Sequence, residues 1–161
     1  MNRYFGKMLL IGCLLAGVGA VTTKAQIDSD TPVEADIPHA FLVGDKTLPA
    51  GKYTIKVLND TNLNLFEIRS SNRHTAVAFE TENVQADRTP RQTELVFNKI
   101  GDQYFLSQIW VSESNYGVQV EKSKMEQGLE GKGMNSERHS VAAHHKSSKK
   151  TKQAKTENSS E

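Results

Sequence analysis

The segment 41-FLVGDKTLPAGKYTIKV-57 contains two runs of strand-forming residues with a defined turn between them. Gly44-Asp45 ends the first run, Pro49 restricts φ inside the turn, and Gly51 supplies the permissive backbone at which the turn ends. Apolar and polar residues then alternate over 53–57, as they do in a half-buried strand. The segment therefore predicts a strand, a turn and a second strand. It contains no nucleophile, general base or phosphate-binding loop, so we expect its role to be structural.

Runs of Val, Ile, Phe, Tyr and Thr recur along residues 37–127 and are separated by Gly, Asn, Asp and Pro. No stretch between them has the helical periodicity and length that a parallel α/β fold needs. We predict a single all-β domain, an antiparallel sandwich or small barrel of six or seven strands, with a short helix at 121–129. Pro38 places the first strand at an edge or starts it later. The expected strands span 37–43, 52–58, 64–70, 75–81, 93–99, 104–111 and a short 118–120.

Gly101 and Asp102 form a two-residue hairpin signal that fixes a register. With only these two residues in the loop, Ile100 pairs with Gln103, Phe97 faces Leu106 and Thr93 faces Trp110. The core face would then contain Leu95, Phe97, Leu106 and Trp110. A three-residue loop would instead turn Phe105 and Ile109 inward, because a slip of one residue inverts the strand. We favour the first register.

The first 25 residues have the organisation of a secretory signal peptide. Arg3 and Lys7 precede fourteen apolar residues over 8–21, and small residues lead to a predicted cleavage between Ala25 and Gln26. A membrane-spanning helix would need about 20 apolar residues. A lipidated Cys13 is the alternative, although the apolar run continues beyond it. We expect an exported protein, periplasmic, secreted or on the cell surface, without cysteine after cleavage and hence without disulfides.

The flanks of the expected domain are polar. Residues 26–36 are acidic and predict a flexible leader, while 128–161 lack aromatic residues and predict a disordered, basic, low-complexity tail. The tail lysines could contact an anionic polymer or lipid, or could simply keep the domain soluble. The chain as a whole has 20 basic and 19 acidic residues, so we expect no nucleic-acid partner. The candidate contacts in the tail are Lys146, Lys149, Lys150, Lys152 and Lys155.

The histidines give little indication of a metal or cofactor site. His39 and His74 lie 35 residues apart without a neighbouring cysteine or a recognised ligand spacing. The other three, His139, His144 and His145, fall in the predicted tail, where no scaffold would hold a metal geometry. We therefore predict no metal and no cofactor.

Carboxylates are the remaining candidates for chemistry. A pair suited to glycoside hydrolysis could come from Glu67, Glu80, Glu82, Asp87 and Glu94. Carboxylates on a half-exposed sheet are usually its solvated face, and no serine-nucleophile elbow is present. We expect a non-enzymatic binding or structural module of the cell envelope, with a protein or polysaccharide partner. A hydrolase or glycan-active enzyme with its carboxylates in a long loop at 81–94 is the alternative, as is tethering to a polyanion through the tail.

Two segments carry a resemblance to a family. The first is Val-Gly-x-Lys-Thr-Leu-Pro-Ala-Gly-x-Tyr from Val43 to Tyr53, and the second is Gly-x-Gln-Tyr-Phe-Leu-Ser-x-Ile-Trp from Gly101 to Trp110. Together they resemble an uncharacterised family of small exported bacterial proteins with a signal peptide and one β domain. The resemblance covers roughly residues 37–126 and implies export and a β domain. It implies no activity.

Overall fold

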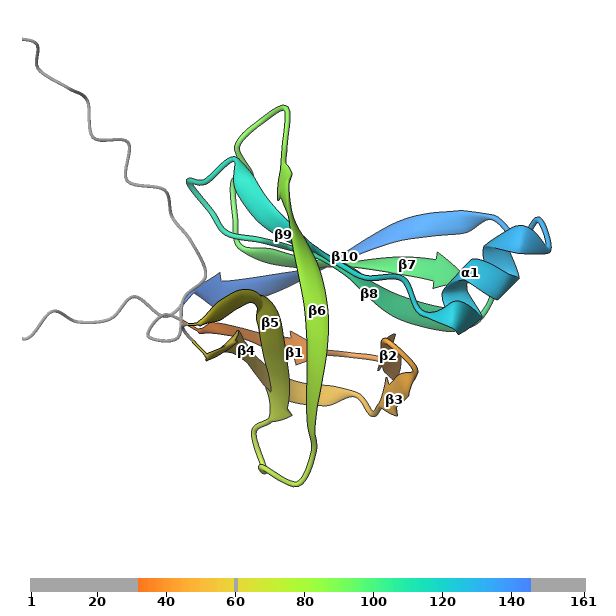
Figure 1. Cartoon of the computed structure of the whole chain (residues 1–161), viewed down its shortest axis with the longest axis horizontal. Coiled ribbons are helices and arrows are strands. Elements are labelled where there is room, and N and C mark those ends of the chain that lie inside the picture. The colour runs from red at the N-terminus through yellow and green to blue at the C-terminus, as the bar shows by residue number, and fades with distance from the viewer. Residues whose placement is uncertain (1–31, 60, 146–161) are drawn as a thin grey trace, which may run out of the picture.

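The computed structural model describes residues 32–59 and 61–145, which form ten strands and one helix (Figure 1). Strands dominate, so the all-β prediction is confirmed. No helix in this part of the chain is long and apolar enough to span a bilayer. The elements are β1 Val33–Ile37, β2 Phe41–Val43, β3 Lys46–Leu48, β4 Gly51–Asn59, β5 Asn62–Ser70, β6 Ala76–Gln85, β7 Glu94–Ile100, β8 Gln103–Trp110, β9 Tyr116–Val120, α1 Lys124–Gly131 and β10 Ser136–His145.

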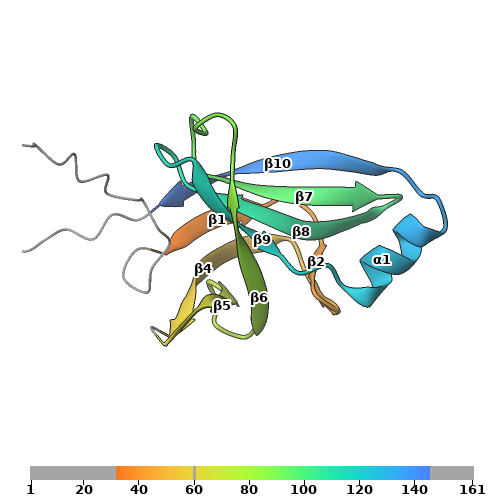
Figure 2. The same cartoon turned by 45° about the horizontal axis from the view of Figure 1, so that its top comes forward.

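Eight of the strands close into an antiparallel barrel. Their order is β8-β7-β10-β1-β4-β5-β6-β9, and a β8–β9 pairing completes the ring. The β2–β3 hairpin lies outside the ring and joins β8 through a parallel contact between Leu42 and Phe105. Figure 2 shows α1 beside the end of the β7–β8 hairpin. The barrel, rather than the sandwich, is therefore the form that the fold takes, because closure leaves no sheet edge in the ring.

Apolar side chains fill the interior of the barrel. Alternate residues of β4 point inward, so Tyr53, Ile55 and Val57 are all buried, as the sequence pattern predicts. Aromatic rings pack at the centre, where Phe41 and Phe97 meet edge to face with centroids 5.5 Å apart. A smaller cluster of Leu42, Ile100 and Phe105 lies outside this core, against Leu129 of α1.

The helix α1 spans Lys124–Gly131, so it starts three residues later and ends two residues later than the expected helix at 121–129. Its start has a clear cap. Ser123 Oγ accepts a hydrogen bond from the Glu126 backbone N–H at 3.1 Å. Asn98 of β7 donates a hydrogen bond to the buried Glu126 carboxylate at 2.8 Å, which ties α1 to the barrel. Burial raises the pKa of Glu126.

The expected leader at 26–36 is wrong for its last residues, because Val33–Ile37 is a full barrel strand. Buried Val33, Ala35 and Ile37 alternate with exposed Glu34 and Asp36, so the acidic residues form the outer face of a strand. The expected strand at 37–43 is in fact two strands. Pro38 follows the end of β1, and a short link precedes β2, since proline cannot donate to a ladder.

The expected disordered tail at 128–161 is likewise wrong for its first half. Residues 136–145 form β10, which pairs with β7 on one side and with β1 on the other. Only Ala143 of this strand is buried, so its apolar content is too low to signal a strand. Backbone hydrogen bonds to two neighbours, rather than a large apolar face, hold it in the barrel. The five tail lysines lie outside the described residues.

The β7–β8 hairpin combines both registers that the sequence allowed. Ile100 pairs with Gln103 and Phe97 with Leu106, so the loop holds only Gly101 and Asp102, and Gly101 has φ +61°. A bulge then places Val96 opposite Gln108 and Glu94, rather than Thr93, opposite Trp110. The extra residue inverts the rest of β8, so the expectation of Trp110 in the main core is wrong. Ile109 and Val111 take that place.

Candidate functional site

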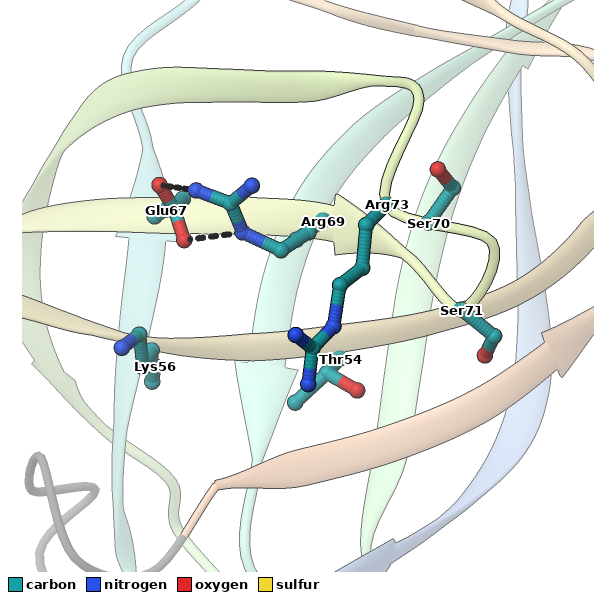
Figure 3. A pocket seen from close by; sticks show the side chains of 7 residues that line it. All are labelled: Thr54, Lys56, Glu67, Arg69, Ser70, Ser71 and Arg73. Atoms are coloured by element: carbon teal, nitrogen blue, oxygen red, sulfur yellow. Dashed lines mark hydrogen bonds and ion pairs between the residues drawn. The ribbon is translucent and has the colours of Figure 1, made fainter.

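A polar groove lies on the outer face of the barrel, over β4 and β5 (Figure 3). Thr54 and Lys56 of β4 point outward because their neighbours fill the core, and they pair in the ladder with Arg69 and Glu67 of β5. The groove has a volume of about 470 Å³ and is open to solvent. Its lining consists of Thr54, Lys56, Glu67, Arg69, Ser70, Ser71 and Arg73.

The ion pair between Glu67 and Arg69 gives the groove a fixed cation. Arg69 donates from Nε to Glu67 Oε1 at 3.0 Å and from Nη2 to Oε2 at 2.7 Å. Glu67 is buried in the groove floor. The hydrogen bonds to Glu67, and its negative charge, raise the pKa of the Arg69 guanidinium. This two-pronged pairing holds the guanidinium plane in one orientation and leaves its third nitrogen for another partner.

A tight turn brings Arg73 over the same groove. Arg73 has φ +61°, and its backbone N–H donates to Ser70 O at 2.8 Å. The Ser70 hydroxyl also donates to Asn72 Oδ1 at 2.6 Å and accepts from the Thr75 backbone N–H at 3.1 Å. Figure 3 shows the Arg73 side chain reaching across β4 toward Thr54. The turn thus places a second guanidinium beside the groove.

Cations outnumber carboxylates in this groove. Lys56, Arg69 and Arg73 contribute three positive charges and Glu67 one negative charge. Within residues 32–59 and 61–145, neither Lys56 nor Arg73 forms an ion pair. Guanidinium, ammonium and hydroxyl groups around one depression are the donors that bind carboxylate or phosphate oxygens.

A second depression of about 400 Å³ adjoins the groove on the outer face of β1. The two share Thr54 and Ser71 as a common wall. The other residues that line the second depression are Glu34, Ala35, Asp36, Lys52, Tyr53, Ala142 and His144.

The five carboxylates that the sequence offered for hydrolysis are spread over the molecule. Glu67 is bound to Arg69, whereas Glu80 and Glu82 of β6 line a separate depression of about 380 Å³ with Glu121. Asp87 lies in the link after β6, and Glu94 lies 3.6 Å from Arg138 at the start of β7. Each described depression therefore holds only part of this set.

The turn residues lie where the chain reverses or changes strand. Pro49 lies between β3 and β4, and its carbonyl accepts a hydrogen bond from the Tyr53 hydroxyl at 2.8 Å. Gly51 begins β4 with φ +152°, a value that favours glycine. The predicted cleavage pair, Ala25 and Gln26, lies outside the described residues.

An aromatic cluster that the sequence did not predict gathers His39 and His139. Their ring centroids are 5.5 Å apart, and His39 stacks on Tyr104 with centroids 3.7 Å apart. His39 Nδ1 lies 3.3 Å from Ala40 O, and Nε2 is buried with no partner. Burial, and secondarily the charge of His139, lowers the pKa of His39, against the effect of Ala40 O. No group of three or more His, Cys, Asp or Glu in the described chain is placed to hold a metal ion.

No protein-family profile, curated protein or solved structure matches this chain. The resemblance to a family of small exported β-domain proteins stays a prediction. The site is therefore interpreted from its geometry and charge.

Proposed function

We propose that the protein is an exported, non-enzymatic binding module of the cell envelope, and that its outer groove holds an anionic group of the ligand. The observation that carries this proposal is the convergence of Lys56, Arg69 and Arg73 on one depression. Packed aromatic and aliphatic side chains occupy the barrel interior, so a ligand meets the molecule on its outer faces. The groove is the described depression with the largest excess of cations.

The lining of the groove supports binding rather than bond cleavage. Its only carboxylate is engaged by Arg69, and its hydroxyl groups have no imidazole among the lining residues to act as a base. Its donors point at a shared, solvent-open space and would hold carboxylate or phosphate oxygens. Exposed ion pairs contribute about 0.2 to 1 kcal/mol each, so we expect weak binding that falls with added salt.

Removing two groove cations tests the proposal. The binding of inorganic tripolyphosphate and of trigalacturonate is measured by calorimetry at low salt. Comparing the two affinities shows whether the groove prefers phosphate or carboxylate groups. We expect Lys56→Ala with Arg73→Ala to weaken binding of at least one probe about tenfold, equivalent to about 1.4 kcal/mol. Neither cation forms an ion pair within the described chain, so the change should leave the fold intact.

The matched control removes two cations elsewhere. Arg88 and Arg91 are exposed in the link between β6 and β7 and do not line the groove. Arg88→Ala with Arg91→Ala makes the same change of net charge and should alter either affinity less than about twofold. Equal losses in the two double variants, or no binding of either probe to the wild type, would contradict the proposal.

A further inference from the structure

The first half of β6 has a neighbouring strand on one side only. β5 pairs with residues 76–80 of β6, whereas the β6–β9 ladder covers residues 81–85. The barrel ring therefore closes through the second half of β6, and the first half extends beyond it. In Figure 1, β9 accompanies only the upper part of β6. Over residues 76–79, the side of β6 away from β5 is an open sheet edge.

The hydrogen bonds around β6 show which backbone groups face this open edge. Glu80 O accepts from Glu121 N–H at 3.2 Å on the β9 side, whereas Thr75 O accepts from the last residue of β5 at 2.9 Å. Because the bonding direction alternates along a strand, the N–H and C=O groups of Ala76 and Ala78 face away from β5. They form no backbone hydrogen bond within the described residues.

The open edge lacks the features that usually protect a sheet edge. Residues 76–80 read Ala-Val-Ala-Phe-Glu, without a proline, a lysine or a bulge in their ladder with β5. The outermost strand β3, in contrast, has three residues and carries Lys46. A row of unpaired backbone groups is a template for pairing with another chain. The edge of β6 is therefore the better suited of the two to accept an added strand.

The open edge borders a depression of about 490 Å³. Residues 77–80 line it together with Leu65, the β2–β3 turn at 43–46 and residues 121–124. Its size is that of a small-ligand site, which suits a few residues of one strand rather than a second barrel. On the inner face of β6, Val77 is half-buried and Phe79 is buried, while Ala78 on the outer face is exposed. An added strand would place one row of side chains against Val77 and Phe79 and the other toward solvent.

We propose that this edge binds an extended peptide segment of a partner protein by antiparallel β-strand addition. Ala76 and Ala78 exchange backbone hydrogen bonds with the segment, and its alternate, apolar side chains contact Val77 and Phe79. An extended backbone presents donors and acceptors at the spacing of about 7 Å between every second residue, which matches the unpaired groups of β6. Both neighbours of β6 are antiparallel, and antiparallel pairing is slightly the more stable. The edge shares no lining residue with the anion-binding groove.

The test uses the peptide acetyl-Lys-Thr-Val-Thr-Val-Thr-Lys-amide and two N-methylated forms of it, by calorimetry on the whole protein. In antiparallel pairing, the residues that bond to Ala76 and Ala78 carry their side chains on the outer face, so they are the threonines. N-methylation of the threonines should weaken binding at least about tenfold, because it removes the N–H groups that bond to β6. N-methylation of the valines should leave the affinity nearly unchanged, because their N–H groups face away from β6.

A change in the protein gives an independent check. Ala78→Pro removes the N–H at the middle of the edge but no ladder bond to β5, so the fold should persist. It should weaken binding of the unmodified peptide at least about tenfold, because the proline has no N–H and its ring lies where the peptide pairs. Ala78→Ser keeps the N–H and is the matched control, which should bind as the wild type does. Circular dichroism of both variants verifies folding.

The outcomes decide the proposal without any anionic probe. Equal affinity of the two methylated peptides for the wild type, or a loss only with the methylated valines, would overturn it. The absence of binding by the unmodified peptide would also overturn it. A wild-type dimer that becomes monomeric in Ala78→Pro would assign the edge to a second copy of the chain instead. Failure of the anion-binding groove would leave all of these results unchanged.

Discussion

Tyr53 stabilises the turn that precedes it. Its hydroxyl donates to Pro49 O at 2.8 Å, and its ring meets Phe41 edge to face at 5.2 Å. The side chain is 3% exposed, and burial raises its pKa. One residue thus joins β4, the turn and the barrel core. This contact accounts for the tyrosine that ends the Pro-Ala-Gly-x-Tyr sequence.

Tyr53→Phe should lower the free energy of unfolding by about 1 kcal/mol, because it removes one buried hydrogen bond and keeps the ring. Denaturant unfolding measures the change. Tyr104→Phe is the matched control, since the Tyr104 hydroxyl makes no hydrogen bond within the described chain and its ring stacks on His39. A larger loss in Tyr104→Phe than in Tyr53→Phe would contradict this account of the turn.

We expect His39 to make the free energy of unfolding depend on pH. Phe97 of β7, Tyr104 of β8 and His139 of β10 surround its ring, and Lys99 lies 5.7 Å from the Tyr104 ring centre. None of these groups is an anion that would stabilise a protonated His39. Its pKa is lowered from the ordinary 6.5, so the unfolded chain takes up the proton first as pH falls.

We therefore expect the free energy of unfolding to decrease as pH falls through about 6.5, with the loss ending once the folded His39 is itself protonated. Unfolding curves between about pH 7.5 and about pH 5 measure this slope. His39→Gln should flatten it, and His74→Gln, at an exposed position, should not. An identical slope in His39→Gln and the wild type would show that another group is responsible.

At the scale of the elements, the pairing of β8 with β9 requires a glycine at position 117. Gly117 lies opposite Trp110 in the ladder, and an added Cβ would lie 2.7 Å from Ile109 O and 2.8 Å from Trp110 Cδ2. The indole therefore covers the bare backbone of β9. This close approach belongs to the seam that closes the barrel.

Gly117→Ala should lower the free energy of unfolding by about 1 to 3 kcal/mol, because the methyl group has no space beside the indole. Gly128→Ala is the opposite case, since Gly128 lies inside α1 and nothing lies within 4 Å of an added Cβ. That change should raise stability by up to about 1 kcal/mol. Thermal unfolding of both variants measures these changes. A Gly117→Ala protein as stable as the wild type would contradict the close approach of Trp110 to Gly117.

Strands with large alternating apolar residues, such as β4, could be predicted from the sequence. β1 could not be predicted because its outer face is acidic, and β10 could not because it has few large apolar residues. The two strands pair with each other although they lie far apart in the chain. The bulge in β8 was also beyond prediction, since both faces of that strand are apolar and either register satisfies the pattern. Whether these segments form strands, and in which register, depends on pairing with distant parts of the chain. The local sequence pattern does not encode that pairing.

At the scale of the whole molecule, the β4–β5 pairing and the turn after β5 assemble the candidate site on the outside of the barrel. Lys56 and Arg69 come from two paired strands, and Arg73 comes from the turn that follows β5. The sequence predicts the β4–β5 hairpin, but it does not predict which outward-facing side chains of the two strands lie side by side, because that depends on the register. The filled interior then leaves the outer surface for binding.

The most direct test of the anion-binding groove is to follow backbone amide chemical shifts during titration with tripolyphosphate and with trigalacturonate. We predict that the shifts change at residues 54–56 and 67–73 with at least one of the two probes. Changes confined to the 81–94 segment or to the lysines beyond residue 145, or no changes at all, would contradict the account.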